Sequence, residues 1–341
     1  MATTKAKTTK KSGAKKANRS KAASTRSKTV KTVEAKTTKK AKVTKVDKVQ
    51  SKADKVAEDK VKIMSEKTNP VKAFFARKSD PSENILTIFK NTKIIGALLG
   101  EIIGTGLVTA IALTLGLFNP LYLIFGYLGV TLVIFAISGA HLNPTITVGM
   151  MASRRISAIR GVLYIIAQVI GAWLSFMIIN SFYNAGLASG NITADTAKLP
   201  GLSPATDLTA GTEGFEWFWI ITMIEFAGAI VLAFFFARAL LHKRSAFTFA
   251  AIVACGVFIA MLFAVVINNT YLGIEDNTFV LNPATAFMYG LLPSSADGFD
   301  ALMNALMPML VTYVAFPFIG GILGFYLSDF IEMLSGRELK A

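Results

Sequence analysis

Two Asn-Pro pairs, Asn143-Pro144 and Asn282-Pro283, have the type and spacing to act on a small solute. Each pair follows a long apolar segment and precedes a short one. Proline at the first turn of a helix loses no hydrogen bond, so each pair is a good helix start. Free N–H groups and the positive end of the helix dipole lie at such a start, and the Asn amide can donate to a passing oxygen. One Asn-Pro pair often only begins a turn, whereas two copies in equivalent places favour a shared function.

Two carboxylates, Glu101 and Glu225, lie inside apolar segments, where a charge is costly and usually functional. One interpretation is coupling to protons or cations, as in a transporter. The other is that each carboxylate accepts hydrogen bonds from irregular backbone before a short helix, which turns the carbonyls of 139–142 and 278–281 toward a pore. The equivalent placement of the two residues in two repeats favours this supporting role.

Six apolar segments are near the length of about 20 residues that a helix needs to cross a bilayer. Two shorter apolar stretches, 143–152 and 282–291, begin at the Asn-Pro pairs and are too short to cross, so we expect re-entrant half-helices there. A hydrophobic content of 53% also indicates a membrane protein. The six long segments cover residues 94–115, 121–138, 158–180, 217–240, 246–267 and 305–328.

An internal repeat organises these segments. The stretch Gly-Glu-Ile-Ile-Gly-Thr (100–105) in the first half corresponds to Ile-Glu-Phe-Ala-Gly-Ala (224–229) in the second. Three crossings per copy is an odd number, so the two copies have opposite orientations in the membrane. We therefore predict an all-α membrane protein with six transmembrane helices and two re-entrant half-helices in an inverted repeat. The channel domain covers 90–333, with repeat one at about 94–180 and repeat two at about 217–328.

Charge is concentrated at the N-terminus. Residues 1–80 contain 25 Lys and Arg against 7 Asp and Glu, and no aromatic residue before Phe74, so we expect a disordered, Lys-rich cytoplasmic tail. Its expected partner is anionic lipid, with nucleic acid or plain solvation as alternatives. The positive-inside rule predicts a multi-pass cell-membrane protein with both termini in the cytoplasm. This predicted orientation follows from the basic residues in the loops after the second and fourth segments: Arg154, Arg155, Arg160, Arg238, Lys243 and Arg244.

Residues 138–145, Ser-Gly-Ala-His-Leu-Asn-Pro-Thr, resemble the first signature loop of the aquaporin and glycerol-facilitator family, the major intrinsic proteins. Residues 281–284, Leu-Asn-Pro-Ala, resemble the second. Glu101 and Glu225 are similar to the buried glutamates of the family's first and fourth helices. The resemblance covers about 94–328 and implies six tilted helices, two half-helices, a homotetramer with one pore per subunit, and no cofactor. It also includes 167–168, 171–172, 316–317 and 320–321.

The sequence departs from this family at three places. Thr145 stands where the first loop usually has Ala, and the stretch before Asn282 is longer than usual. Thr285 stands where the family usually has the Arg of its narrow filter. The loss of that Arg removes a fixed positive charge and a bulky hydrogen-bond donor.

Family spacing places the other filter residues. Phe279, three residues before Asn282, matches an aromatic wall typical of glycerol facilitators, with simple packing as the alternative. Leu123, twenty residues before Asn143, falls at the second-helix position of the filter, with Phe125 as a competitor. His141 resembles a residue that lines the cytoplasmic vestibule, and a backbone-holding role is equally open. A wide, apolar constriction of this kind favours linear polyols over water alone.

These residues predict a passive channel for small neutral solutes, namely glycerol, other small polyols and water. Asn143 and Asn282 would orient the solute. The sequence offers no catalytic constellation and no metal-ligand spacing, with a single Cys and two His, so we expect neither an enzyme nor a cofactor. Because Thr285 removes a charge barrier, an ion channel or coupled secondary transporter on the same scaffold is the alternative. A third possibility is a membrane anchor for the basic tail.

Overall fold

The computed structural model describes residues 89–116, 120–192, 211–242, 245–267, 279–289 and 306–335, together with Thr270. Within these ranges every regular element is a helix, and six helices are long and apolar enough to cross a membrane. The prediction of an all-α membrane fold with six crossings is confirmed. The predicted tail, 1–80, lies outside the described residues.

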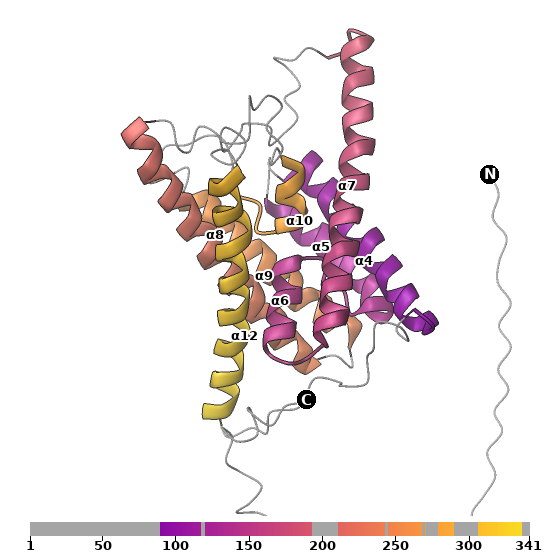
Figure 1. The fold of residues 1–341 in the computed structure, drawn as a ribbon, viewed down its shortest axis with the longest axis vertical. Coiled ribbons are helices and arrows are strands. Elements are labelled where there is room, and N and C mark those ends of the chain that lie inside the picture. The colour runs from indigo at the N-terminus through magenta and orange to yellow at the C-terminus, as the bar shows by residue number, and fades with distance from the viewer. Residues whose placement is uncertain are drawn as a thin grey trace, which may run out of the picture. The chain divides into compact units, whose positions relative to one another are not determined.

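Labels follow Figure 1. The first repeat has three long helices and the half-helix α6, Pro144–Ala152. The second has three long helices and the half-helix α10, Pro283–Ala286. The long helices are α4 Thr92–Ile111, α5 Pro120–Ser138 and α7 Ala158–Ala188, then α8 Gly211–Ala239, α9 Ala246–Val266 and α12 Phe316–Leu334.

Some bounds differ from those predicted. The third crossing continues to Ala188 and the sixth to Leu334, each beyond the apolar stretch itself, because polar residues such as Asn180 and Asp329 can stay in a helix that has already formed. Two π-helical turns, Ala112–Gly116 after α4 and Val311–Ala315 before α12, extend those crossings. The second half-helix is shorter than expected, since α10 gives way after Ala286 to a 3-10 turn, Phe287–Tyr289. Such turns are frequent at helix ends.

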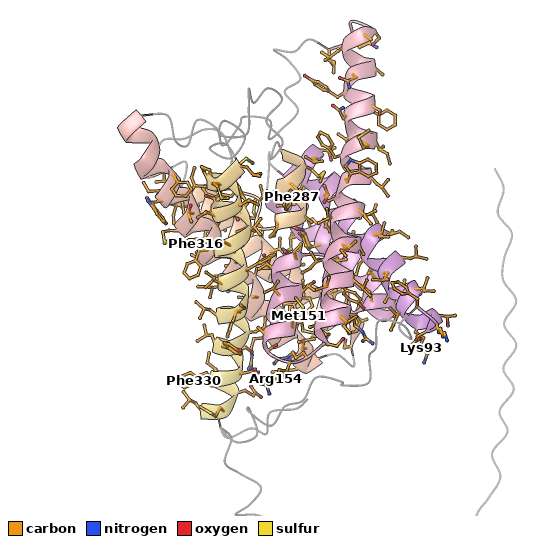
Figure 2. The ribbon with its side chains drawn as sticks, in the orientation of Figure 1. Lys93, Met151, Arg154, Phe287, Phe316 and Phe330 are labelled. Carbon is orange, nitrogen blue, oxygen red and sulfur yellow. The ribbon has the colours of Figure 1, made fainter. Side chains whose placement is uncertain are left out.

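The outer faces of the long helices are apolar. Phe125 and Val133 of α5 are 65% and 68% exposed, and Phe330 of α12 points away from the neighbouring helices (Figure 2). A water-soluble protein buries such side chains, whereas a bilayer solvates them and requires only that the backbone satisfy its own hydrogen bonds. The exposed apolar faces therefore agree with the predicted membrane crossing.

The two repeats pack by the same rule. Helix α4 lies against α7 in the first repeat, and α8 lies against α12 in the second. Each crossing uses a glycine, because a Cβ on Gly171 would strike the backbone oxygen of Ile102, and one on Gly320 would lie 2.7 Å from that of Phe226. Each half-helix also contacts the last helix of the other repeat, α6 with α12 and α10 with α7. Figure 1 shows α10 above α6, both between α12 and α7.

Basic residues mark one end of the bundle. Lys93 and Arg154 both lie at the lower end in Figure 2. Arg155 makes two hydrogen bonds to the carboxylate of Asp329, at 2.7 and 3.2 Å, and Arg238 lies 2.6 Å from a carboxylate oxygen of Glu332. These pairs tie the end of α6 and the end of α8 to α12.

Candidate pore site

The two Asn-Pro loops meet each other through their asparagines. The Nδ2 atom of Asn143 donates to the carbonyl oxygen of Leu281 at 2.8 Å. The Nδ2 atom of Asn282 donates to the carbonyl oxygen of Leu142 at 3.0 Å. Both asparagines are buried, at 2% and 3% exposure. Side chains 139 residues apart in sequence thus form a reciprocal pair between the starts of the two half-helices.

Each asparagine also caps its own half-helix. The side-chain oxygen of Asn143 accepts from the backbone N–H of Thr145 at 2.8 Å, and that of Asn282 accepts from Ala284 at 3.1 Å. Proline follows at the first helical position in both cases. Ncap side chains of this kind satisfy one of the free N–H groups at a helix start. The cap fixes the carboxamide plane, so the amide nitrogen is directed at the opposite loop.

Glu101 holds the first loop and is completely buried. Its Oε1 atom accepts from the Ser138 hydroxyl at 2.6 Å and from the backbone N–H of His141 at 3.0 Å. Its Oε2 atom accepts from the backbone N–H of Leu142 and from the Gln168 amide, both at 2.8 Å. All four donors converge on one carboxylate, as charge-assisted hydrogen bonds that are stronger than neutral ones.

Glu225 holds the second loop and is also completely buried. Its Oε1 atom accepts from the backbone N–H of Val280 at 2.6 Å. The backbone N–H of Leu281 lies 3.0 Å from Oε2 and 3.3 Å from Oε1. Both glutamates therefore contact the backbone that leads into an Asn-Pro pair, which is the arrangement that the supporting role requires.

The backbone of these loops is in an uncommon conformation. Ala140, Leu142 and Leu281 have φ angles of 51°, 54° and 52°, in the left-handed region that costs a residue with a Cβ about 1–2 kcal/mol. The carboxylate hydrogen bonds offset this cost. The carbonyls of Leu142 and Leu281 are each taken by the opposite asparagine. The carbonyls of 139–142 and 278–281 are expected from the sequence to face the pore as acceptors. The last carbonyl of each loop is therefore not free for a solute, and Thr278 lies outside the described residues.

A glycine one turn beyond each glutamate makes room for the leucine of its loop. A Cβ built on Gly104 would strike the end of the Leu142 side chain, and a Cβ on Gly228 would strike that of Leu281. Leu142 and Leu281 are 1% and 3% exposed. Glutamate, glycine and leucine thus form the same packing unit in both repeats.

His141 lies in the first loop at 5% exposure. Its Nδ1 atom is 3.2 Å from the hydroxyl oxygen of Thr147, and its ring packs edge-on against Tyr164 and Phe236 at centroid distances of 5.1 and 5.8 Å. Gln168 donates to Thr147 at 2.9 Å and so joins this group to Glu101. These contacts hold the ring between side chains of α6, α7 and α8.

The structure brings four predicted residues together around a cavity of about 20 Å³: Leu123, Phe279, Asn282 and Thr285. Phe125, the competitor of Leu123, is 65% exposed and does not line this cavity. The hydroxyl oxygens of Thr285 and Thr109 are 2.9 Å apart and buried. A cavity of this size holds about one water molecule. Phe287, labelled in Figure 2, follows α10 at the upper end of this region, and Met151 lies in the last turn of α6 below it.

Sequence reasoning missed two polar residues of this region. Tyr127 lines the cavity together with Asn282, and its place four residues after Leu123 on one helical face is a signal that could have found it. Thr109, the partner of Thr285, carries no comparable sequence signal. Among the described residues, no group of three or more His, Cys, Asp or Glu is placed to hold a metal ion.

Comparison with known proteins agrees with this geometry. The family model described as "Major intrinsic protein" matches residues 89–327. Aquaporin-1 of Sus scrofa is 30% identical over 195 residues, which are 57% of this chain and 59% of the relative. The glycerol uptake facilitator protein-like 6 of Lactiplantibacillus plantarum is 31% identical over 111 residues, 33% of this chain and 45% of the relative. The chain therefore matches less than two thirds of the length of either relative.

A solved structure is also similar to this chain. The aquaglyceroporin from Plasmodium falciparum aligns with a TM-score of 0.49 and 20% sequence identity, covering 69% of this chain and 96% of that one. The family model alone spans more than half of the sequence and includes both Asn-Pro loops and both glutamates. On this evidence the chain belongs to the major intrinsic protein family.

Proposed function

We propose that this protein is a passive transmembrane channel for small neutral solutes, chiefly glycerol and other small polyols together with water. The reciprocal contact of Asn143 and Asn282 beside a small cavity supports this function most directly. It sets two amide donors where a permeating oxygen can accept from them, and it involves no nucleophile or acid–base pair. The names of the aquaporin-1 and glycerol uptake facilitator relatives agree with it.

The cavity wall supports solutes with both hydroxyl and hydrocarbon faces. Leu123, Phe279 and Met261 provide apolar surface, and Asn282 and Thr285 provide hydrogen-bonding groups. A polyol presents carbons on one side and hydroxyls on the other, so it can replace its hydration shell in such a constriction. Thr285 stands where the family usually has Arg, whose side chain would narrow the opening and place a positive charge there.

Ions are excluded by other means in this channel. A charge that enters an apolar constriction loses hydration that the wall cannot replace, which costs several kcal/mol. The start of α6, a half-helix of nine residues, adds a positive potential that opposes cations. Glu101 and Glu225 do not offset this, because their oxygens are taken up by the loop backbone.

In the cell we expect a multi-pass protein of the cell membrane with both termini in the cytoplasm, since the basic residues Lys93 and Arg154 share one end of the bundle. The channel domain covers 90–333, and the assembly is a homotetramer with one pore in each subunit. The basic tail, 1–80, binds anionic lipid at the inner leaflet.

Stopped-flow light scattering on proteoliposomes tests this function. Vesicles that contain the protein should equilibrate water and glycerol faster than empty vesicles, with no current under an applied voltage. The matched variant Asn282→Asp keeps the side-chain shape but removes both N–H groups, including the one that donates to Leu142, and it should abolish the added flux. A current carried by the protein would instead favour the ion channel or coupled transporter. An absence of solute flux from a folded protein would reject the channel.

A further inference from the structure

Tyr127 lies on the cavity side of α5, one turn beyond Leu123. It lines the same cavity as Asn282 and Thr285. Its ring packs against two buried apolar clusters, one around Leu123 and Leu281 and the other around Ile134 and Leu142. The ring is therefore held in place by apolar contacts that do not depend on the hydroxyl group.

The Asn282 side chain makes two hydrogen bonds within the protein. A side-chain amide has one oxygen that accepts and two N–H groups that donate. The oxygen of Asn282 accepts from Ala284 and one N–H donates to the carbonyl of Leu142, while the phenol group of Tyr127 lines the same cavity. A solute that reaches this asparagine therefore meets the phenol group of Tyr127 beside the amide.

Asn143 makes the equivalent pair of hydrogen bonds. Its oxygen accepts from Thr145 and one N–H donates to the carbonyl of Leu281, as in the other loop. Among the described residues, no acceptor takes its second N–H. The two asparagines are thus alike in their own hydrogen bonds, but Asn282 shares a cavity wall with Tyr127, whereas Asn143 does not line that cavity.

We propose that Tyr127 is a solute-contacting, specificity-determining residue of this channel, whose phenol group adds a hydrogen-bonding partner beside the Asn282 amide for the permeating molecule and favours polyols over water. The phenol O–H donates to a solute oxygen, and the Thr285 hydroxyl lines the same cavity. As a polyol passes through this water-sized space, its hydroxyls can bind the two groups in turn while its carbons contact Leu123 and Phe279. A water molecule is a single small partner and gains less from a second group.

This inference rests on the proposed function, because a specificity residue has meaning only in a conducting channel. The test compares Tyr127→Phe with the wild type in proteoliposomes and measures glycerol and water permeability on the same vesicles. The variant keeps the packed ring and removes the hydroxyl alone. We expect the ratio of glycerol to water permeability to fall about three- to tenfold, the factor for the loss of one hydrogen bond.

The matched control is Tyr122→Phe, which makes the same chemical change on the same helix at a residue that is 48% exposed and does not line the cavity. Its permeability ratio should equal that of the wild type. If Y127F does not yield folded protein, the test uses Tyr127→Met instead, which also removes the hydroxyl and has a flexible apolar side chain.

An unchanged ratio in Y127F, or equal changes of water and glycerol flux, would overturn the assignment of Tyr127 while leaving the channel itself intact. A fall of the ratio in Y122F as large as in Y127F would also overturn it. Failure of the proposed function gives a different result, since the wild-type vesicles would then carry neither solute faster than empty vesicles.

Discussion

Glu101 and Glu225 occupy equivalent points of the two repeats, yet their surroundings differ. Glu101 accepts from two backbone N–H groups and from the side chains of Ser138 and Gln168. Among the described residues, Glu225 accepts only from the backbone of Val280 and Leu281. The first loop leads into a half-helix of nine residues and the second into one of four. Backbone contacts alone thus suffice to hold such a loop, and the added side chains stiffen the first half.

The glutamine variants of the two glutamates should show this difference most strongly. Glutamine replaces one carboxylate oxygen by an NH₂ group, which cannot accept a hydrogen bond. In Glu101→Gln this group faces two donors whichever oxygen it replaces. In Glu225→Gln it can replace Oε2, where it faces a single donor. An unsatisfied buried polar group costs about 1–3 kcal/mol, so E101Q should lose about 2–6 kcal/mol and E225Q about 1–3 kcal/mol. Thermal unfolding in detergent measures both. Equal losses would mean that the side chains of Ser138 and Gln168 contribute nothing.

The filter of the second half can be tested by restoring the residue that the family usually has. Thr285→Arg places a long cation in a cavity of about 20 Å³, so we expect glycerol flux to fall about tenfold or more, equivalent to about 1.4 kcal/mol of added barrier, and water flux to fall less. Thr285→Val, which keeps the shape of the side chain, is the control for simple disruption. Equal losses of water and glycerol flux in T285R would contradict the placement of the filter at Thr285.

Substitution of the glycine beside each loop leucine tests how far each repeat can adapt to an added methyl group. Gly104→Ala and Gly228→Ala both drive a methyl group into the leucine of the loop, and overpacking of this kind costs about 1–3 kcal/mol. We expect G104A to cost more, because Leu142 belongs to the loop that Glu101 holds with four donors. Gly96→Ala, on the same helix as Gly104 with nothing within 4 Å of the new methyl group, should be harmless. A larger fall in unfolding temperature for G228A than for G104A would contradict this prediction.

The smallest effect is expected from two buried threonines. The Thr145 hydroxyl has no hydrogen-bond partner among the described residues, whereas that of Thr285 is paired with Thr109. Thr145→Val should therefore raise stability by about 1 kcal/mol, and Thr285→Val should lower it by a similar amount. The midpoint of thermal unfolding in detergent distinguishes the two signs. A loss of stability in T145V would show that its hydroxyl has a partner in the membrane.

Much of the fold was predictable because it follows from local rules. Six crossings follow from segment length and hydropathy, and the two half-helices follow from Asn-Pro before short apolar stretches. The positions of Asn143, Asn282, Glu101 and Glu225 follow from the repeat. The hydrogen bonds between the asparagines and the opposite leucine carbonyls needed the three-dimensional meeting of two loops, and no pattern in either loop indicates them.

Other features depend on contacts between distant side chains. Tyr127 shares a helical face with Leu123 in the sequence, but its place beside Asn282 follows only from the packing of α5 against the second loop. The predicted sixth crossing ended at residue 328, so Asp329 and Glu332 were left outside it, although they pair with Arg155 and Arg238. Hydropathy alone ends a helix where charge begins, whereas an ion pair allows the helix to continue.

The exchange of hydrogen bonds between the two loops has a consequence for biogenesis. The first repeat leaves the ribosome before the second is made. The amide of Asn143 and the carbonyl of Leu142 therefore cannot form these hydrogen bonds until Leu281 and Asn282 have been inserted. During that interval the early half is exposed to quality-control proteases. Two separately translated halves, co-expressed, should protect each other from degradation, and either half made alone should be short-lived.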